Sequence, residues 1–441
     1  MRITNCFLVA RGASASGLAC TVFVLLFAGT AAAENWPQWR GAKIDGISHE
    51  RNLPQQWSKT DNVAWKLDLP GPAGSTPVVW DDRIFLTSAD GSDLVLLAVS
   101  TAGKQLWKQV LSGDNKAVRG DEGNYASPSP STDGRHVWAL VGTGELGCYT
   151  VAGQQVWKFN LQDRYGKLDI AFGLTSTPVL DRGRLYLQLL YTGGAHVIAL
   201  DAATGSEIWR HARKSDARDE CEHSYASPIV YRDGGTELLL SHGADYIVAH
   251  RLSDGGEVWR CGGLNPKGNY NPTLRFVATP VAAPGLVVVP SAKNGPVLGI
   301  DPNSKGDITE TGKGRRWVRE HNTPDVPSPL VVDDLVYLCR EDGTLICMEA
   351  KTGKQIYQKR THADRHRASP VYGDGKLYLT ARDGTVSVIK AGRNFEIFAS
   401  NSLGEDVSSS PAIAHGRIYL RTFKSLYAIG PAQIRAASRQ R

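Results

Sequence analysis

The sequence lacks several features that mark common functional classes. After residue 33 it has no apolar run long enough to cross a membrane, and it has no Cys-x-x-Cys-His segment for haem attachment. It also lacks a concentrated stripe of lysine and arginine, and its formal net charge is only +6 over 441 residues. We therefore expect no transmembrane segment and no nucleic-acid partner, and we expect a monomer.

Residues 1–33 have the pattern of a secretory signal. Arg2 and Arg11 supply positive charge, an apolar run follows over residues 21–28, and an alanine triplet ends at Ala33. This order is typical of export, and the run is too short to span a bilayer. We predict cleavage near Ala33 and a periplasmic or extracellular protein. Its net charge falls from +6 to +4, because the signal holds two arginines and no acid.

The cysteines beyond the signal are odd in number. Exported proteins can hold disulfides, and the sequence places two of these cysteines, Cys339 and Cys347, on either side of one turn. The alternative is that all are buried small apolar residues, which we favour, and geometry decides between the two. The five are Cys148, Cys221, Cys261, Cys339 and Cys347.

A short Ser/Thr/Pro-rich step recurs along the chain. Its prolines lie 41 to 52 residues apart. A regular spacing of this size indicates a repeat architecture. The steps are Ser75-Thr76-Pro77, Ala126-Ser127-Pro128, Ser176-Thr177-Pro178, Ala226-Ser227-Pro228, Ala278-Thr279-Pro280, Pro327-Ser328-Pro329, Ala368-Ser369-Pro370 and Ser409-Ser410-Pro411.

Each repeat has the pattern of four short antiparallel strands and no helix. Near copies of one strand stand at residues 184–187, 335–338, 376–379 and 417–420, and Asx-Gly turns such as Asp383-Gly384 follow. The last strand of most units carries an aromatic residue, which we expect to pack one sheet on the next. The sequence therefore predicts an all-β, eight-bladed β-propeller over residues 62–430.

The two ends of the repeat region complement each other. The eighth unit stops near residue 429 without its last strand, while residues 62–67 resemble such a strand. We predict that this N-terminal strand completes the last blade, which removes two open sheet edges. Residues 34–61 form a leader segment, and residues 431–441 form a basic tail.

The units resemble the pyrroloquinoline-quinone (PQQ) repeat. Residues 199–209 match its pattern Ala-Leu-Asp-Ala-x-Thr-Gly-x-x-x-Trp at every fixed position, and residues 35–41 resemble the N-terminal segment of exported bacterial PQQ-binding-like β-propeller proteins. The resemblance implies one of two functions. One is a PQQ- and Ca²⁺-dependent alcohol or sugar dehydrogenase, and the other is a BamB-like scaffold that binds proteins without a cofactor. A shared fold does not choose between them.

Function is expected where the repeats differ, in the loops that enter each inner strand at one mouth of the channel. The alternative is that these loops are polar only because they are exposed to solvent. Arg119, Glu122, Phe172, Glu220 and Arg275 lie in these loops. As the ligand or partner face we single out Asn124, Tyr125, His223, Tyr225, His366, Arg367 and Asp406.

A PQQ enzyme would need oxygen ligands for Ca²⁺, a carboxylate base and cations for the PQQ carboxylates. Glu222, Asn271, Asp325 and Arg365 have this chemistry and are the cofactor candidates. The adjacent Cys-Cys pair of many quinoprotein alcohol dehydrogenases is absent from the sequence. We therefore expect a binding and scaffold protein with no cofactor and assign no catalytic residue; the dehydrogenase remains the alternative.

Two further patterns are weighed against a function. His362 and His366 have the spacing of a helical metal pair, but they lie in a predicted loop without the glutamate of zinc proteases. Residues 142–147 match a dinucleotide-binding glycine pattern, but a strand and not a helix follows. We expect no metal and no dinucleotide.

Overall fold

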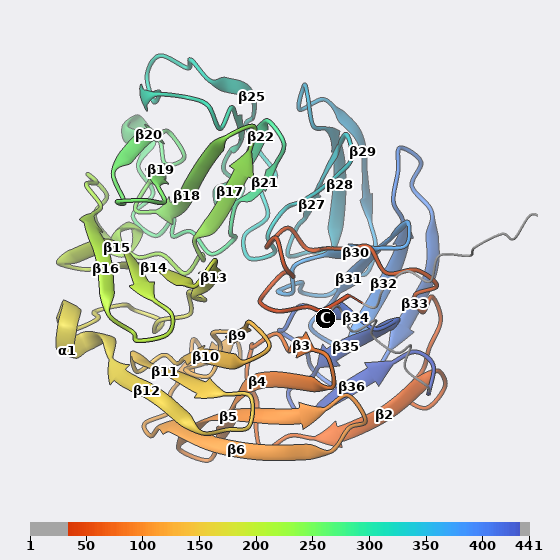
Figure 1. Cartoon of the computed structure of the whole chain (residues 1–441). Coiled ribbons are helices and arrows are strands. Elements are labelled where there is room, and N and C mark those ends of the chain that lie inside the picture. Colours follow the sequence, from red (N-terminus) through yellow and green to blue (C-terminus); the bar gives the residue numbers. More distant parts are fainter. Residues whose placement is uncertain (1–33, 433–441) are drawn as a thin grey trace, which may run out of the picture. The chain divides into compact units, whose positions relative to one another are not determined.

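The computed structural model describes residues 34–432, so the predicted signal and most of the basic tail lie outside the described residues. These residues form eight four-stranded antiparallel blades around a central channel, which confirms the predicted propeller (Figure 1). No helix among the described residues is long and apolar enough to cross a membrane.

The blades follow one another along the chain, and each begins with its innermost strand. Blades 1 to 4 consist of β3 (Val78–Trp80), β4 (Arg83–Asp90), β5 (Asp93–Ser100) and β6 (Gln105–Ser112); β9 (Ser131–Thr132), β10 (His136–Leu140), β11 (Glu145–Thr150) and β12 (Gln155–Asn160); β13 (Val179–Asp181), β14 (Arg184–Tyr191), β15 (Gly194–Asp201) and β16 (Glu207–Ala212); β17 (Ile229–Asp233), β18 (Thr236–Gly243), β19 (Tyr246–Arg251) and β20 (Glu257–Cys261).

Blades 5 to 8 have the same order, except that the outermost strand of blade 8 comes from the N-terminal side. They consist of β21 (Val281–Ala283), β22 (Leu286–Pro290), β23 (Val297–Ile300) and β25 (Arg315–Arg319); β26 (Leu330–Val332), β27 (Leu335–Cys339), β28 (Thr344–Glu349) and β29 (Gln355–Arg360); β30 (Val371–Gly373), β31 (Lys376–Thr380), β32 (Thr385–Lys390) and β33 (Ile397–Ser402); β34 (Ala412–Ala414), β35 (Arg417–Arg421), β36 (Ser425–Ile429) and β2 (Val63–Asp68).

The ring closes as the sequence predicts. Strand β2 pairs antiparallel with β36, so Leu67 lies opposite Leu426 and Val63 opposite Ile429 (Figure 1). The first and last parts of the described chain thereby share one sheet. Because this pairing covers the edge that β36 would otherwise expose, the propeller has no unfinished blade.

A few elements lie outside the repeat. β1 (Ile47–Ser48) and β24 (Gly306–Asp307) add parallel to β30 and β20, and β7 (Ala117–Val118) with β8 (Gly123–Asn124) forms a separate hairpin. The prediction that the units hold no helix is wrong between blades 2 and 3. There Asn160 caps the short helix α1 (Leu161–Tyr165) by accepting from the amide of Gln162. Two 3₁₀ turns also occur, η1 (Asp219–Glu222) and η2 (Lys267–Asn269).

The Ser/Thr of each Ser/Thr-Pro step has a structural function. In every blade this hydroxyl accepts a hydrogen bond from the backbone amide of the corresponding Ser/Thr in the preceding blade, at 2.9 to 3.2 Å, and the bonds close into a ring around the channel. The ring corrects the predicted position of one Ser/Thr-Pro step. In the second unit the member is Ser129, which precedes Pro130, and not Ser127. The other members are Thr76, Thr177, Ser227, Thr279, Ser328, Ser369 and Ser410.

The tryptophans of the outer strands join neighbouring blades. The indole N–H of Trp107 donates to the carbonyl of Val151 at 3.1 Å, and that of Trp317 donates to the carbonyl of Ala350 at 2.8 Å. Similar bonds run from Trp65, Trp157, Trp209 and Trp259. These contacts confirm that the repeated aromatic residue packs one sheet against the next.

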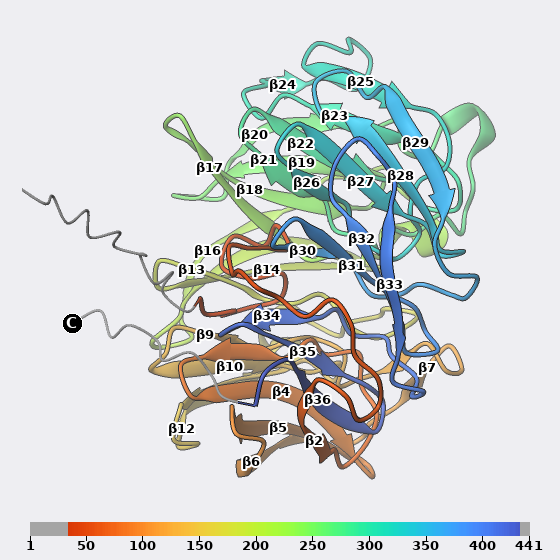
Figure 2. The ribbon, with the colours of Figure 1, turned by 90° about the vertical axis from the view of Figure 1, so that its right-hand side faces the viewer.

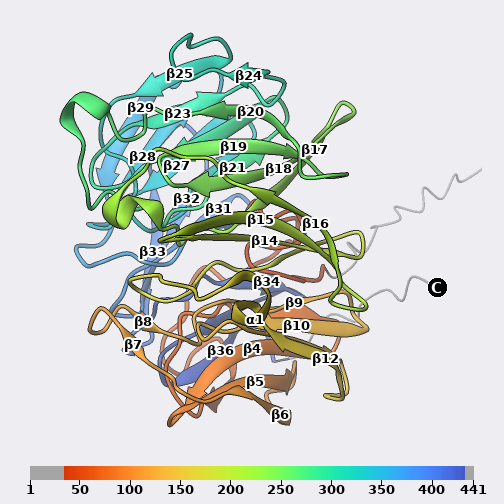
Figure 3. The same ribbon diagram turned by 90° about the vertical axis from the view of Figure 1, so that its left-hand side faces the viewer.

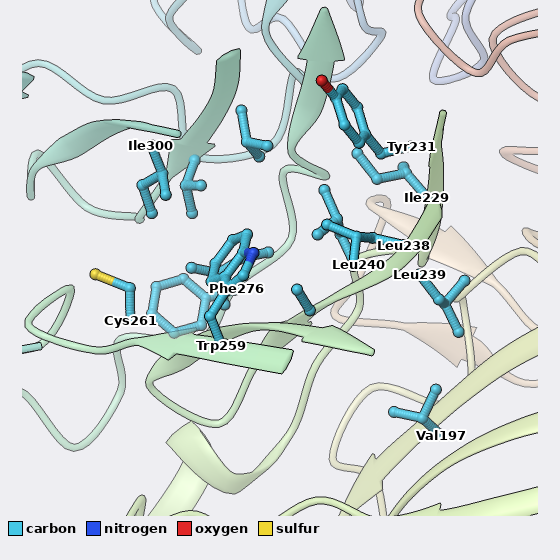
Figure 4. Close-up of a cluster of buried hydrophobic side chains, with 14 of the residues drawn as sticks. Val197, Ile229, Tyr231, Leu238, Leu239, Leu240, Trp259, Cys261, Phe276 and Ile300 are labelled. Atoms are coloured by element: carbon cyan, nitrogen blue, oxygen red, sulfur yellow. The ribbon is translucent and has the colours of Figure 1, made fainter. Parts of the chain in front are cut away.

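The apolar core fills the spaces between blades. Figure 4 shows one such cluster, where Leu240, Trp259, Phe276 and Ile300 come together from blades 4 and 5 and the loop between them. The five cysteines of the described chain are buried and free. Across the hairpin, Cys339 lies opposite Leu345 and not opposite Cys347. The interpretation of these cysteines as buried apolar residues is confirmed.

The leader covers one face of the propeller. Trp36 exchanges backbone hydrogen bonds of 2.8 Å with Val79 of blade 1, and Gln38 accepts from the amide of Leu180 in blade 3. Arg40 is 1% exposed and donates to the carbonyl of Pro329 at the start of blade 6. Since these partners stand around the ring, the leader crosses this end of the channel. Figures 2 and 3 show it, in red, on the face opposite the β7–β8 hairpin.

Candidate functional site

The other end of the channel holds a cavity of about 200 Å³. Its wall takes residues from the segment just before the inner strand of every blade. This is where the sequence places the variable loops. The contributing residues are Gly74, Ser127, Thr175, Tyr225, Val277, Val326, Arg367 and Ser408.

Two aromatic rings and two arginines form the most distinctive part of this cavity. The rings of Phe172 and Tyr225 lie 5.9 Å apart. The guanidinium carbons of Arg119 and Arg275 lie 5.7 and 5.6 Å from the centre of the Phe172 ring. Cations at this distance from an aromatic face are stabilised by its quadrupole. The cavity therefore combines an apolar surface with two guanidinium groups.

Arg275 and Tyr225 are both buried beside the cavity. Arg275 is paired with Glu220 at 3.0 Å and is 7% exposed. The hydroxyl of Tyr225 is buried and has no hydrogen-bond partner among the described residues. Burial raises the pKa of this phenol, so it keeps its proton at neutral pH. Because buried polar groups are normally satisfied, this hydroxyl is free to bond to a ligand.

The β7–β8 hairpin reaches over the cavity from the chain between blades 1 and 2. At its tip Glu122 accepts from Arg367 of blade 7 through both oxygens, at 2.6 and 2.7 Å. Its neighbour Asp121 accepts from Arg365 at 2.6 Å, and Arg382 donates to the Asp121 carbonyl at 2.9 Å. The hairpin is thus fastened to a blade some 240 residues away in sequence by charged hydrogen bonds.

These ion pairs lower the pKa values of the two acidic residues of the hairpin. The hydrogen bonds from Arg367 lower the pKa of Glu122, although burial acts in the opposite direction. The bond from Arg365 lowers the pKa of Asp121 in the same way. Both carboxylates are therefore charged at neutral pH, and the hairpin stays fastened there.

The structure places the predicted partner-face residues in two groups. Tyr225 and Arg367 line the cavity. Asn124 shapes the base of the hairpin, because its amide donates to the carbonyl of Pro72 at 2.6 Å. Tyr125 packs so closely on Gly142 and Gly173 that a Cβ at either glycine would approach its ring to 2.6 or 2.5 Å.

The remaining three partner-face residues contact neighbouring loops. His223 is 6% exposed and bonds to the Thr192 hydroxyl at 2.8 Å, and burial lowers its pKa. His366 is fully buried, with its Nδ1 2.9 Å from the Asp364 carbonyl. Asp406 lies 3.5 Å from Arg382 on the rim. These side chains support the loops around the cavity rather than line it.

The four cofactor candidates are not paired with one another in the described contacts. Asp325 lines the cavity. Asn271 accepts from the amide and hydroxyl of Thr273 at 3.0 Å and so caps a local turn, and Arg365 is bonded to Asp121. Glu222 lies in η1. Sequence spacing brings these residues to one face but not into one ligand set.

The residues at the cavity do not fit PQQ with Ca²⁺. Calcium takes six to eight oxygen ligands, while the cavity wall offers only two carboxylates, Glu122 and Asp325, and both oxygens of Glu122 are bonded to Arg367. The cavity of about 200 Å³ is also smaller than the roughly 300–1,000 Å³ of typical cofactor pockets. We derive no redox step from this site.

Sequence reasoning misses Arg382 and Asp383. Arg382 precedes the Asp383-Gly384 turn between β31 and β32, and Asp383 begins it. Because such turns recur in other units, the repeat pattern predicts only a structural role for this one. The signal that could have found Arg382 is its difference from Glu341, the residue at the same place in the preceding unit.

The chain is similar to known proteins along most of its length. A family model described as "Outer membrane protein assembly factor BamB" matches residues 55–127 and 93–359. The outer membrane protein assembly factor BamB of Burkholderia pseudomallei (strain K96243) is 23% identical over 259 residues, which span 58% of this chain and 57% of that protein.

Solved structures share the fold at low identity. BamB from Moraxella catarrhalis superposes with a TM-score of 0.62 at 15% identity, over 85% of this chain and 99% of that one. Quinohemoprotein alcohol dehydrogenase from Comamonas testosteroni gives 0.68 at 14% identity, over 92% and 82%. Both functional alternatives are thus represented among proteins of this shape. Because the family match spans more than half of the sequence, the chain belongs to the BamB-like family of PQQ-repeat β-propellers.

Proposed function

We propose that this chain is an exported binding and scaffold protein that holds a partner at the loop-bearing end of its channel. The observation that carries the proposal is the difference between the two ends. The leader covers one end with buried backbone contacts, whereas the other end presents a cavity with Arg119, Arg275 and a Tyr225 hydroxyl that has no partner among the described residues. Arginine and tyrosine beside an apolar ring are typical of residues that dominate protein interfaces.

The chemistry of the cavity favours an acidic group on the partner. Two guanidinium groups flank Phe172; Arg275 is paired with Glu220, whereas Arg119 has no carboxylate partner among the described residues, and the neighbouring phenol can donate one more hydrogen bond. A carboxylate accepts such bonds strongly, and an apolar neighbour on the same ligand would cover the Phe172 ring. We propose that the partner inserts an acidic side chain or its C-terminal carboxylate here.

The cellular setting of the proposal follows from the relatives and the N-terminus. The relatives are named outer membrane protein assembly factors, and residues 1–33 predict export with cleavage near Ala33. We propose a monomer that works in the periplasm or outside the cell, with the leader and the propeller acting as one unit. A role in outer membrane protein assembly is the function we propose for it.

Site-specific photocrosslinking in the producing cell tests the proposal. A photoreactive amino acid at Phe172 should crosslink a specific envelope protein, and one at exposed Arg51 on the leader side should not. Arg119→Ala, at an exposed position, should abolish the crosslink without changing the unfolding midpoint. Equal crosslinking from both positions, or none from Phe172, contradicts the proposal.

Titration with PQQ and Ca²⁺ tests the dehydrogenase alternative. We expect no binding, because the cavity lacks a calcium ligand set. Stoichiometric, Ca²⁺-dependent binding that Asp325→Asn removes, followed by dye-linked oxidation of an alcohol or sugar, would replace the scaffold proposal by the enzyme.

A further inference from the structure

A separate cluster on blade 7 has the donors of a metal site. One imidazole nitrogen of His362 and one carboxylate oxygen each from Asp364 and Asp383 all lie within 4.8 Å of one another. The geometry points to a site for a single divalent transition metal ion of the Zn²⁺ class. The site differs from the His362–His366 pair weighed in the sequence, because His366 bonds to the Asp364 carbonyl instead.

The donor types favour Zn²⁺ or a similar ion over Ca²⁺. Imidazole nitrogen with carboxylate oxygen suits zinc, whereas calcium prefers an all-oxygen shell. Bonds of about 2.0–2.2 Å to each donor would require side-chain shifts on the order of 1 Å from the present separations. Three protein donors leave a fourth tetrahedral position for water or an outside ligand.

The guanidinium groups of the arginines beside the two aspartates bond to other acidic residues. Arg365 follows Asp364 in sequence and Arg382 precedes Asp383, yet both guanidinium groups bond to Asp121 of the hairpin. In the described contacts neither guanidinium group pairs with Asp364 or Asp383, although the backbone amide of Arg365 donates to Oδ1 of Asp364. Two carboxylates close together repel unless a cation lies between them, so the cluster is suited to a bound metal ion.

Asp383 uses its two oxygens for different purposes. Oδ1 accepts from the amide of Thr385 at 2.9 Å, which fixes the turn, and Oδ2 lies 2.8 Å from Nε2 of His362. Blade 6 repeats the first contact, because Asp342 accepts from the amide of Thr344. Blade 6 does not repeat the contact with a histidine, because Oδ2 of Asp342 lies 3.9 Å from the guanidinium group of Arg340. The second oxygen of Asp383 therefore serves this blade alone.

The backbone around the cluster is held in place before any ion binds. The carbonyl of Gly343 accepts from the amide of Thr361 at 2.9 Å. A Cβ at Gly343 would come within 1.9 Å of the carbonyl oxygen of His362, so only glycine fits at this position. The amide of Arg382 donates to the carbonyl of Arg365 at 2.6 Å. Such prior ordering lowers the cost of binding.

Titration of the purified full-length chain with Co²⁺ and Zn²⁺ tests the site. We expect one ion per chain, visible absorption from bound Co²⁺ that Zn²⁺ displaces, and a rise in the unfolding temperature with Zn²⁺. His362→Gln and Asp383→Asn should each weaken binding by at least about 10–100-fold. Asp383→Asn keeps an oxygen for the Thr385 amide, so the turn should survive.

Two matched variants serve as controls. Asp342→Asn changes the equivalent turn of blade 6, and His136→Gln removes a half-buried histidine that lies 3.8 Å from a single aspartate, Asp133. Both should bind Co²⁺ like the parent protein. Absence of Co²⁺ binding, or binding that survives in His362→Gln and Asp383→Asn, overturns the assignment. Neither result bears on the proposed binding of a partner carboxylate in the cavity beside Phe172, which the crosslinking tests separately.

Discussion

The two ends of the channel are built from different interactions. At the leader end, Trp36 is 1% exposed and Arg40 is bonded to backbone carbonyls of its own turn and of blade 6. At the cavity end, the β7–β8 hairpin is fastened by carboxylate–guanidinium pairs such as Glu122–Arg367. Apolar burial and backbone bonds give stability that changes little with pH, whereas charge pairs respond to pH, salt and ligands. We conclude that the leader end stabilises the ring, and we expect the charge pairs of the cavity end to respond to the proposed partner.

Truncating Trp36 should have the largest effect. Because its ring is almost fully buried between the leader and blade 1, Trp36→Ala should lower the free energy of unfolding by about 3–5 kcal/mol. Urea denaturation measures the loss. Leu106→Ala, at a position 45% exposed, should stay within about 0.5 kcal/mol of the parent. A loss below about 1 kcal/mol at Trp36 would mean that the leader is not an integral part of the fold.

Breaking the Glu122–Arg367 pair, the clamp that fastens the β7–β8 hairpin to blade 7, should have a smaller effect on stability. Glu122→Gln removes the charge that Arg367 faces, and leaving a largely buried cation without its carboxylate should cost about 1–3 kcal/mol. Hydrogen exchange should rise over residues 117–124 and stay unchanged in the leader. As a control, Lys108→Ala breaks a half-exposed pair with Asp90 and should cost no more than about 1 kcal/mol. Unchanged exchange in the hairpin would contradict the clamp.

Acid should abolish the difference between Glu122→Gln and the parent protein. The pKa of Glu122 is lowered in the folded state by Arg367. Its contribution is therefore complete above the unfolded pKa, about 4.3, and is lost as the pH falls through the lower folded value. Urea midpoints measured from pH 7 to pH 3 should converge below about pH 4. A gap that stays constant or widens would show that the carboxylate charge is not what fastens the hairpin.

Tyr225→Phe should have the smallest effect on stability. Because the hydroxyl has no partner among the described residues, its removal should change the free energy of unfolding by less than about 0.5 kcal/mol. The crosslink from Phe172 should nevertheless weaken, since the partner would lose one hydrogen bond. A marked loss of stability would show that the hydroxyl is satisfied within the protein.

Much of the fold follows from the sequence because it depends on features that repeat in every blade. The Ser/Thr-Pro steps, the Asx-Gly turns and the outer tryptophans each recur, and their spacing predicts the blade number and the closing strand β2. The errors occur where a unit departs from the pattern. Two consecutive proline steps, at Pro128 and Pro130, hide the place of Ser129 in the hydroxyl ring, and the loop after β12 holds a cap that starts α1.

The candidate sites could be predicted only in part. The sequence indicates which end of the channel carries dissimilar loops, and Tyr225, Asp325 and Arg367 do line the cavity. It does not show that Arg275 and Arg119 flank one ring, or that the hairpin of Glu122 reaches blade 7. These contacts join residues from different blades, and no local spacing encodes them.

By itself the sequence determined the periodic framework: eight blades, their turns, the ring closure and the role of the tryptophans. The reason is that each unit meets the same neighbour in the same way, so one local pattern specifies all eight interfaces. Only the tertiary structure decided which loop side chains meet at the cavity, where the leader crosses the channel, and that Asp383 faces His362. Those contacts depend on how the ring curves and closes, which no single unit contains.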